Sequence, residues 1–106
     1  MIVTTIKIHG LSRKRREIIQ TIKGLADQVV KDEGCTSADF YQDMENKDIF
    51  YLLEEWKTIE DLERYLNSRS LAVLLGLDNL LAERLEIKHA VKCTAGNNML
   101  QGGECV

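Results

Sequence analysis

Residues 50 to 75 read FYLLEEWKTIEDLERYLNSRSLAVLL, and this stretch decides the fold of the chain. Its first part is an apolar run that ends in Glu-Glu-Trp-Lys, which is typical of a buried strand. Thr58 follows, with a hydroxyl that can cap a helix, and apolar residues then recur at steps of three and four. The stretch therefore predicts a strand from Ile49 to Lys57 that is followed at once by a helix.

The residues around this stretch supply more strands and a long helix. The series Ile2, Thr4, Ile6, Ile8 alternates with Val3, Thr5, Lys7, which predicts a half-buried strand. Helical spacing of apolar residues then predicts a helix with Ser12 as its N-cap and Gly34 as its C-cap. The other elements that we expect are a strand from Cys35 to Glu45, a turn at residues 46–48, a helical piece from Ser70 to about Leu81, and a strand from Arg84 to Cys93 with Leu85, Ile87, His89 and Val91 facing inward.

The order strand, helix, strand, strand, helix, strand is the α+β plan called ferredoxin-like. In this plan two helices cover one face of a four-stranded antiparallel sheet. A chain of 106 residues fits one such domain. We expect the domain to occupy residues 1–93, and the glycine-rich tail, residues 94–106, to be flexible.

The second face of the sheet predicts a partner. The third strand is apolar on both sides, with Ile49, Tyr51 and Leu53 on one and Phe50, Leu52 and Trp56 on the other. One layer of helices cannot cover both faces, and a large exposed apolar face marks an association surface. A second copy of the chain, sheet against sheet, is the simplest cover, so we expect a homodimer.

Composition excludes several classes of protein. A net charge of -3 argues against general nucleic-acid binding, which needs a basic face. The apolar run from Leu71 to Leu77 is too short to cross a membrane, and the first residues do not form a secretory signal, so we expect a cytoplasmic protein. The three cysteines are widely spaced and form no CxxC pair, so we expect no metal site.

The chain resembles a known family. The strand end EEWK, the helix start TIEDLERYL, and the Asn67-Ser68 pair with the leucine-rich piece after it resemble the antibiotic biosynthesis monooxygenase domain, over about Ile2 to Val91. The resemblance implies a dimeric α/β barrel. It also implies oxygenation of a small phenolic or quinol-type aromatic molecule without a cofactor.

Several positions depart from the patterns of known members of that family. An aromatic polyketide oxygenase carries an Asn four residues before the strand-three Trp and a Tyr six residues after it, where this chain has Leu52 and Leu62. Haem-degrading members need a Trp, an axial His and an Asn where this chain has Tyr65, Leu75 and Ile6. Leucine cannot bind iron, so we expect neither haem nor another cofactor.

Two residues are candidates for proton transfer. His89 lies in the inward series of the last strand, where it could act as acid or base or be a satisfied core histidine. Glu54 shares a strand face with Trp56, so it could be a partly buried base or could form a salt bridge at the rim.

The candidate pocket walls are Trp56, Tyr65, Phe40 and Leu52. Packing in the core or the dimer interface is the alternative role for Trp56, and packing with a hydrated hydroxyl is the alternative for Tyr65. Two functions stay open at this point. One is a cofactor-independent monooxygenase, and the other is a non-catalytic dimer that binds a small ligand or has a regulatory role.

Overall fold

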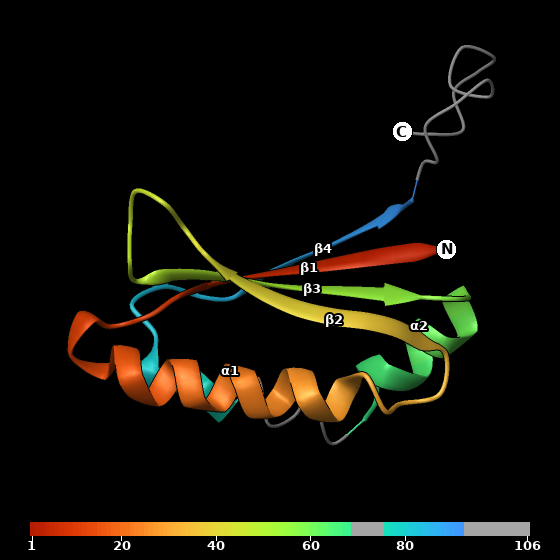
Figure 1. Ribbon diagram of the computed structural model, residues 1–106, viewed down its shortest axis with the longest axis horizontal. Helices are drawn as coiled ribbons and strands as arrows, with labels where there is room; N and C mark the ends of the chain where they lie inside the picture. The colour runs from red at the N-terminus through yellow and green to blue at the C-terminus, as the bar shows by residue number, and fades with distance from the viewer. Residues whose placement is uncertain (69–75, 93–106) are drawn as a thin grey trace, which may run out of the picture.

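The computed structural model describes residues 1–68 and 76–92 of the chain. It confirms the predicted order of elements (Figure 1). In chain order these are strand β1 (Ile2–His9), the 3-10 turn η1 (Ser12–Lys14), helix α1 (Arg15–Val29), strands β2 (Cys35–Gln42) and β3 (Ile49–Trp56), helix α2 (Ile59–Leu66), the 3-10 turn η2 (Gly76–Leu80) and strand β4 (Glu86–Val91).

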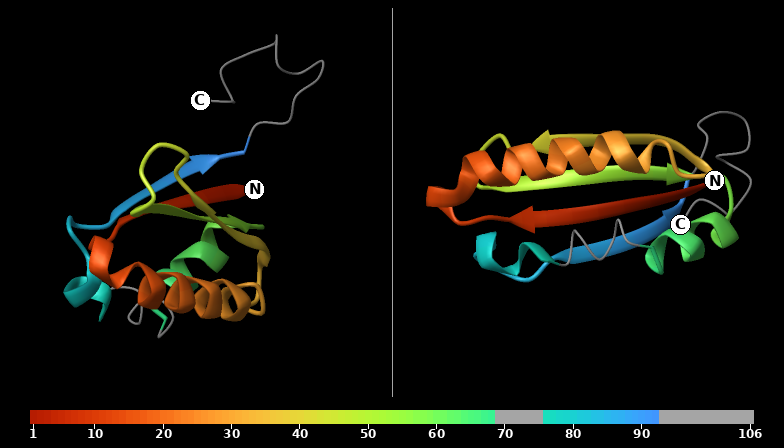
Figure 2. Two further views of the ribbon diagram at one scale, coloured as in Figure 1. Left: turned by 60° about the vertical axis from the view of Figure 1, so that its left-hand side comes forward. Right: turned by 90° about the horizontal axis from the view of Figure 1, so that it is seen from below.

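The four strands form one antiparallel sheet in the order β2-β3-β1-β4. Both helices lie on the same face of this sheet, as expected for the ferredoxin-like plan (Figure 1). Seen from the helix side, α1 runs along the β2 and β3 half, whereas α2 lies near one end of β4 (Figure 2). The two halves of the sheet therefore face different helices, α1 on the β2 and β3 side and α2 at the end of β4.

The hydrophobic core lies between the sheet and the helices. Alternation along β1 and β3 sends every second side chain into it, and α1 adds a stripe at helical spacing. Burying one such side chain contributes roughly 1.5 to 3 kcal/mol. The core residues of the strands and of α1 are Ile6, Ile8, Phe50, Leu52, Trp56, Ile18, Ile22, Leu25, Ala26 and Val29.

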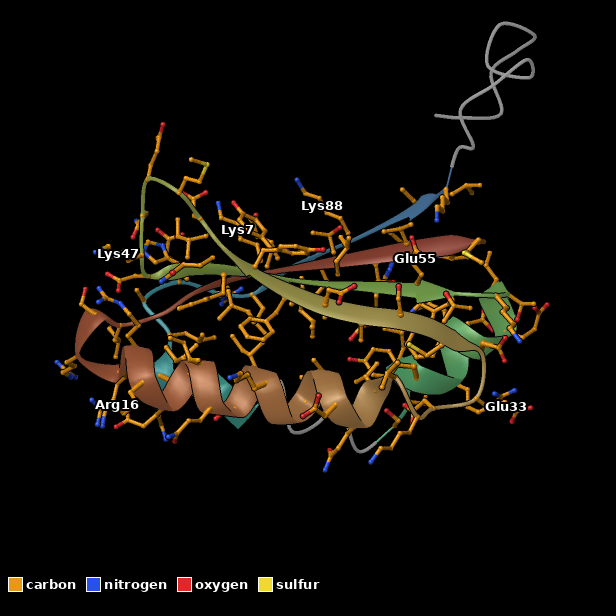
Figure 3. The ribbon with its side chains drawn as sticks, in the orientation of Figure 1. Lys7, Arg16, Glu33, Lys47, Glu55 and Lys88 are labelled. Atoms are coloured by element: carbon orange, nitrogen blue, oxygen red, sulfur yellow. The ribbon has the colours of Figure 1, made fainter. Side chains whose placement is uncertain are left out.

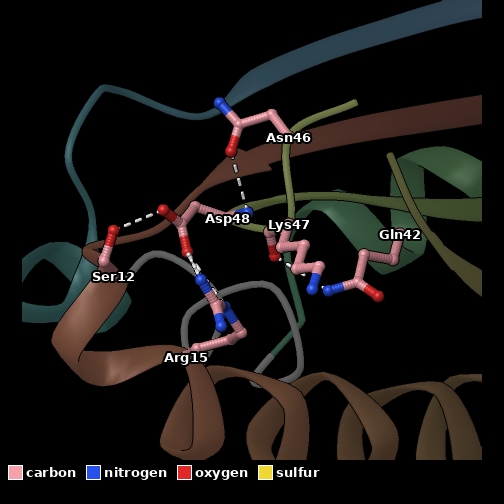
Figure 4. A network of polar contacts seen from close by, with 6 residues as sticks. All are labelled: Ser12, Arg15, Gln42, Asn46, Lys47 and Asp48. Carbon is pink, nitrogen blue, oxygen red and sulfur yellow. Dashed lines mark hydrogen bonds and ion pairs between the residues drawn. The ribbon is translucent and has the colours of Figure 1, made fainter. Parts of the chain in front are cut away.

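The start of α1 differs from the prediction. Ser12 does not cap the helix, because its hydroxyl donates a hydrogen bond to the carboxylate of Asp48. Arg15 donates to Asp48 Oδ1 as well, from Nε at 3.0 Å and from Nη2 at 2.8 Å (Figure 4). These bonds, that of Ser12 first, hold the pKa of Asp48 below its ordinary value. Asp48 thus ties the turn between β2 and β3 to the first turn of α1.

Other element ends also differ from the prediction. Helix α1 ends at Val29, and Gly34 lies beyond it with φ +86° in the connection to β2. Strand β2 ends at Gln42 because the Asp43 carboxylate accepts backbone hydrogen bonds from Glu45 and Asn46, each at 3.0 Å, which turns the chain.

Helix α2 begins as predicted. The Thr58 hydroxyl accepts a hydrogen bond from the Asp61 N–H at 3.1 Å, which confirms the predicted N-cap. Residues 69–75 and the tail 94–106 lie outside the described residues, so most of the second helical piece and the flexible tail stay predictions. Within residues 1–68 and 76–92, no helix has the length and apolar composition that crossing a membrane requires.

The face of the sheet opposite the helices is mixed rather than apolar throughout. Tyr51 and Leu53 of β3 lie half-buried on it, as predicted. The neighbouring strands add charged residues, among them Lys7 and Lys88, which point away from the helices (Figure 3). We call this surface the outer face of the sheet.

Candidate functional site

Two cavities flank helix α2 on opposite sides. The side chains of one helix face, at spacings of three and four, line a groove of about 460 Å³. The next face lines a smaller crevice of about 130 Å³. The groove is lined by Ile2, Ile59, Leu62, Glu63, Leu66, His89, Ala90 and Val91. The crevice is lined by Asp32, Glu33, Trp56, Asp61, Arg64, Tyr65 and Ser68.

We call the first cavity the His89 groove. Its walls come from α2, from the start of β1 and from the end of the edge strand β4, and they are mainly aliphatic. Among the described residues that line it, His89 and Glu63 are the ionisable ones. An apolar cavity of this size with few polar groups is the usual form of a small-molecule site.

His89 is fixed in the groove by one contact. It lies opposite Thr4 in the β1–β4 register, and its Nδ1 is 2.9 Å from Thr4 Oγ1. The register confirms that His89 faces the helix side of the sheet. The residue is exposed, however, so the alternative of a core histidine is wrong. The contact leaves Nε2 as the ring nitrogen that can meet a ligand.

Glu54 is completely buried, and the Tyr65 hydroxyl donates a hydrogen bond to its Oε2 at 3.0 Å. Its Oε1 has no hydrogen-bond partner in the described part of the chain. Burial raises the pKa of Glu54 to about 7, against the opposite effects of the Tyr65 hydroxyl and the nearby Trp56 indole N–H. The carboxyl group therefore exists in both protonation states near neutral pH.

The salt-bridge alternative for Glu54 is wrong, since no cation pairs with it among residues 1–68 and 76–92. Its neighbour Glu55 makes such a pair instead. Glu55 Oε1 lies 3.0 Å from Lys92 Nζ. Alternation along β3 explains the difference, because successive side chains point to opposite faces.

Trp56 and Tyr65 pack against each other beside this carboxyl group. Their ring centroids are 4.8 Å apart, and the two side chains are almost fully buried. The Tyr65 hydroxyl is buried and donates its hydrogen bond to Glu54, so the alternative of a hydrated hydroxyl is wrong.

The nearby thiol of Cys35 is not activated. Burial and the charge of Glu54 raise the pKa of the Cys35 thiol to about 11, which makes Cys35 a poor nucleophile.

The structure brings only some of the predicted site residues together. His89 lines the groove, whereas Trp56 and Tyr65 line the crevice on the other side of α2. Leu52 is a fully buried core residue, and Phe40 is partly buried against the core. Neither residue lines the groove or the crevice, so their placement makes them packing residues.

Sequence reasoning missed Thr4 as a site residue. It is fully buried, and it contacts His89 from the central strand. The available signal was the series Ile2, Thr4, Ile6, Ile8, in which one polar residue interrupts an apolar strand face. A hydroxyl in such a series needs a hydrogen-bond partner, and that partner could have been sought on a neighbouring strand.

Comparisons with known proteins agree with the fold and identify the family. The family model described as antibiotic biosynthesis monooxygenase matches residues 1–73. A conserved protein from Methanosarcina mazei Go1 is 29% identical, with a TM-score of 0.79 over 87% of this chain and 92% of that chain. No curated protein matches the chain.

Two structures with lower identity share the fold. A candidate antibiotic biosynthesis monooxygenase from Deinococcus radiodurans is 16% identical, with a TM-score of 0.83 over 92% of this chain and 97% of that chain. A second candidate, from Nitrosomonas europaea, is 17% identical, with a TM-score of 0.81 over 89% of this chain and 100% of that chain. Because the family model covers well over half of the sequence, the chain belongs to the antibiotic biosynthesis monooxygenase family.

Proposed function

We propose that this protein is a monooxygenase that transfers one oxygen atom from O2 to a small phenolic or quinol-like aromatic molecule, without metal, flavin or haem. One observation carries the proposal. An apolar groove of about 460 Å³ contains a single histidine whose Nδ1 is held by Thr4. That volume lies within the range of roughly 300 to 1,000 Å³ that is common for small-molecule sites.

The groove supplies what such a reaction needs from a protein. An electron-rich aromatic substrate must lose a proton before it can reduce O2, and His89 Nε2 is placed to take that proton. The aliphatic walls, such as Leu62 and Leu66, offer the aromatic ring of the substrate an apolar surface. The anion then transfers an electron to O2.

The atoms balance without a further reactant. The substrate radical and superoxide combine into a peroxide on the ring carbon. Loss of water from that peroxide leaves a carbonyl group, so that a CH2 group and O2 become C=O and H2O. The substrate carbon is oxidised, one oxygen atom stays on it, and the other leaves as water.

The described residues do not fit a haem-degrading site. Ile6 and Tyr65 occupy two of the positions that such members use, and both are buried in the core. The Tyr65 hydroxyl is already committed to Glu54. The third position, Leu75, lies outside the described residues. This supports a reaction without haem.

The proposal includes a homodimer that pairs through the outer face of the sheet. Tyr51 and Leu53 lie half-buried at its centre, and Tyr41 is 53% exposed beside them. Charges lie among them, with Asp39 directly opposite Leu53 and Lys7 directly opposite Tyr51. Protein interfaces commonly combine aromatic and aliphatic side chains with charged ones.

A non-catalytic dimer that binds a small ligand is the second candidate. It is favoured by Leu52 and Leu62, which are buried where an aromatic polyketide oxygenase keeps polar groups. Such a protein would bind aromatic molecules in the groove without consuming oxygen.

Oxygen uptake separates the two candidates. Purified protein treated with a chelator is tested on a panel of hydroquinones and anthrones, together with the variants His89→Gln and His9→Gln. His9 is the matched control, because it is the other histidine of the chain and lies beside Glu83 rather than in the groove. We expect uptake by the wild type and the His9 variant, and a loss of roughly 100-fold or more in the His89 variant. Equal uptake in the His89 variant, or no uptake by the wild type, would contradict the proposal.

A further inference from the structure

Three polar side chains from three different strands lie in one row across the helix side of the sheet. Thr4 of β1 is directly opposite Glu54 of β3 on one side and His89 of β4 on the other. Directly opposite side chains of an antiparallel pair have Cβ atoms about 4.5 to 5.5 Å apart and point to the same face. Thr4 and Glu54 are also the polar residues buried in the described core.

Thr4 contacts His89 at one end of the row, and Glu54 at the other end has a carboxyl oxygen that can still accept a hydrogen bond. Thr4 Oγ1 lies 2.9 Å from His89 Nδ1. At the other end, Glu54 Oε2 accepts the Tyr65 hydroxyl, while Oε1 has no partner among residues 1–68 and 76–92. The free carboxyl oxygen thus belongs to the residue beside Thr4. A rotation of the carboxyl group or one bridging water would complete the row.

We propose that Glu54, Thr4 and His89 form a proton relay between the buried core and the groove, with Thr4 as the positioning residue that couples the other two. The catalytic use of this relay rests on the proposed oxygenase function. His89 Nε2 takes a proton from the substrate, His89 Nδ1 passes its proton to Thr4 Oγ1, and the Thr4 hydroxyl passes its own to Glu54. The proton later returns along the row to the peroxide, which then loses water.

The relay depends on the single hydroxyl hydrogen of Thr4, which can be donated either to Glu54 or to His89 Nδ1. When Glu54 is ionised, the Thr4 hydroxyl donates to the carboxylate and accepts the N–H of His89 Nδ1, so His89 Nε2 carries a lone pair. When Glu54 is protonated, its O–H donates to Thr4, Thr4 donates to Nδ1, and the hydrogen of the imidazole sits on Nε2. The protonation state of Glu54 therefore selects the tautomer of His89. Because burial raises the pKa of Glu54 to about 7, both states occur near neutral pH.

The other ionisable groups around the row do not replace any of its members. Tyr65 and Cys35 beside Glu54 are kept neutral, because burial raises the pKa of each. Asp32 lies near enough to raise the pKa of Glu54 by its charge. Glu63 of α2 is the acidic residue that shares the groove with His89.

The test is an NMR titration of the imidazole nitrogens in protein labelled with ¹⁵N-histidine, from about pH 5 to pH 9. The chain contains 2 histidines, so the His9→Gln variant assigns the signals. In the wild type we expect the His89 nitrogens to change tautomer as Glu54 titrates. Thr4→Val keeps the shape of the side chain without the hydroxyl, and Glu54→Gln removes the carboxyl group. Each should abolish the change of tautomer, and Thr4→Ser should retain it.

The same tautomer throughout the titration of the wild type, or a change of tautomer that persists in Thr4→Val, would overturn the relay. Because the titration needs no substrate, its result is independent of oxygen uptake. A change of tautomer without oxygen uptake would leave the relay standing and reject the oxygenase. If the protein does consume oxygen, Thr4→Val should lower kcat about tenfold or more with little change in KM, and Thr4→Ser should restore it. An unchanged kcat in Thr4→Val would reject the use of the relay in catalysis.

Discussion

The carboxyl group of Glu54 should make the stability of the folded protein depend on pH. Burial raises its pKa from 4.5 to about 7, so the folded protein holds this proton more tightly than the unfolded chain does. The resulting stabilisation is fully present below the unfolded pKa and is lost as the pH rises through 7. The loss should be about 3 kcal/mol.

We expect Glu54→Gln to flatten this dependence, because an amide is neutral at every pH and its oxygen can still accept the Tyr65 hydrogen bond. Urea unfolding at several pH values between those two pKa values and above them measures the slope. Glu55→Gln is the control, since it changes the adjacent carboxylate on the opposite face. If the Glu54 variant keeps the wild-type slope, the carboxyl group does not have a raised pKa.

At the scale of single residues, the sequence indicated which side chains can transfer protons but not which side chains contact one another. Both proton-transfer candidates, Glu54 and His89, could be selected from alternation along their strands, and their catalytic roles remain predictions. Thr4 could not be connected to them, because the connection depends on the register of three strands. A shift of one residue in either register would send Thr4 to the opposite face.

At the scale of elements, two glycines should respond in opposite ways to the same substitution. Gly34 has φ +86°, and a Cβ atom there would collide with the side chain of Asp61 in the first turn of α2. Gly24 lies in the middle of α1 with open space around it. Gly34→Ala should therefore destabilise the protein, whereas Gly24→Ala should stabilise it by about 0.5 to 1 kcal/mol through helix propensity.

The free energy of unfolding of both variants, from urea titrations under identical conditions, checks this pair. Destabilisation by Gly24→Ala would show that α1 is not continuous at that position. A neutral Gly34→Ala would show that the approach of α2 to the start of β2 is looser than the structure has it.

The order of the elements was predictable, whereas their ends were not. Patterns of period two and of three to four residues extend over whole elements, so they survive local irregularities. Where a helix or strand ends depends on single side chains that can form either of two sets of hydrogen bonds. Ser12 could cap a helix or bind Asp48, and Asp43 could continue a strand or accept hydrogen bonds that turn the chain. A tertiary contact decides between the two uses of Ser12, which no local pattern contains, whereas a local turn decides between those of Asp43.

At the scale of the whole molecule, the outer face of the sheet should hold two copies together. Leu53→Asp places a charge at the centre of the expected interface, and Met44→Asp places the same charge at a residue that is 100% exposed in the turn between β2 and β3. Sedimentation equilibrium at micromolar concentration should show a dimer for the wild type and for Met44→Asp. The dissociation constant of Leu53→Asp should rise on the order of 100-fold or more. A wild type that sediments as a monomer would contradict the dimer.

The fold class could be predicted because a strand and a capped helix in direct succession fit few arrangements. The groove could not be predicted, since it lies between α2 and the end of β4 at one edge of the sheet, and its form depends on how these two elements diverge. The mixed outer face was also hidden, because its charges come from all four strands, among them Lys7, Asp39, Glu55 and Lys88, and only the strand register brings them beside Tyr51 and Leu53.

The proposed function is tested most directly by the fate of the two oxygen atoms. Chelator-treated protein is incubated with anthrone under ¹⁸O2, and the anthraquinone and the water are analysed by mass spectrometry against a reaction without protein. We expect accelerated formation of anthraquinone that carries one ¹⁸O atom, with the second in water, and loss of the acceleration in His89→Gln. Anthraquinone formed no faster than without protein, or formed with oxygen from water, would contradict the proposed function.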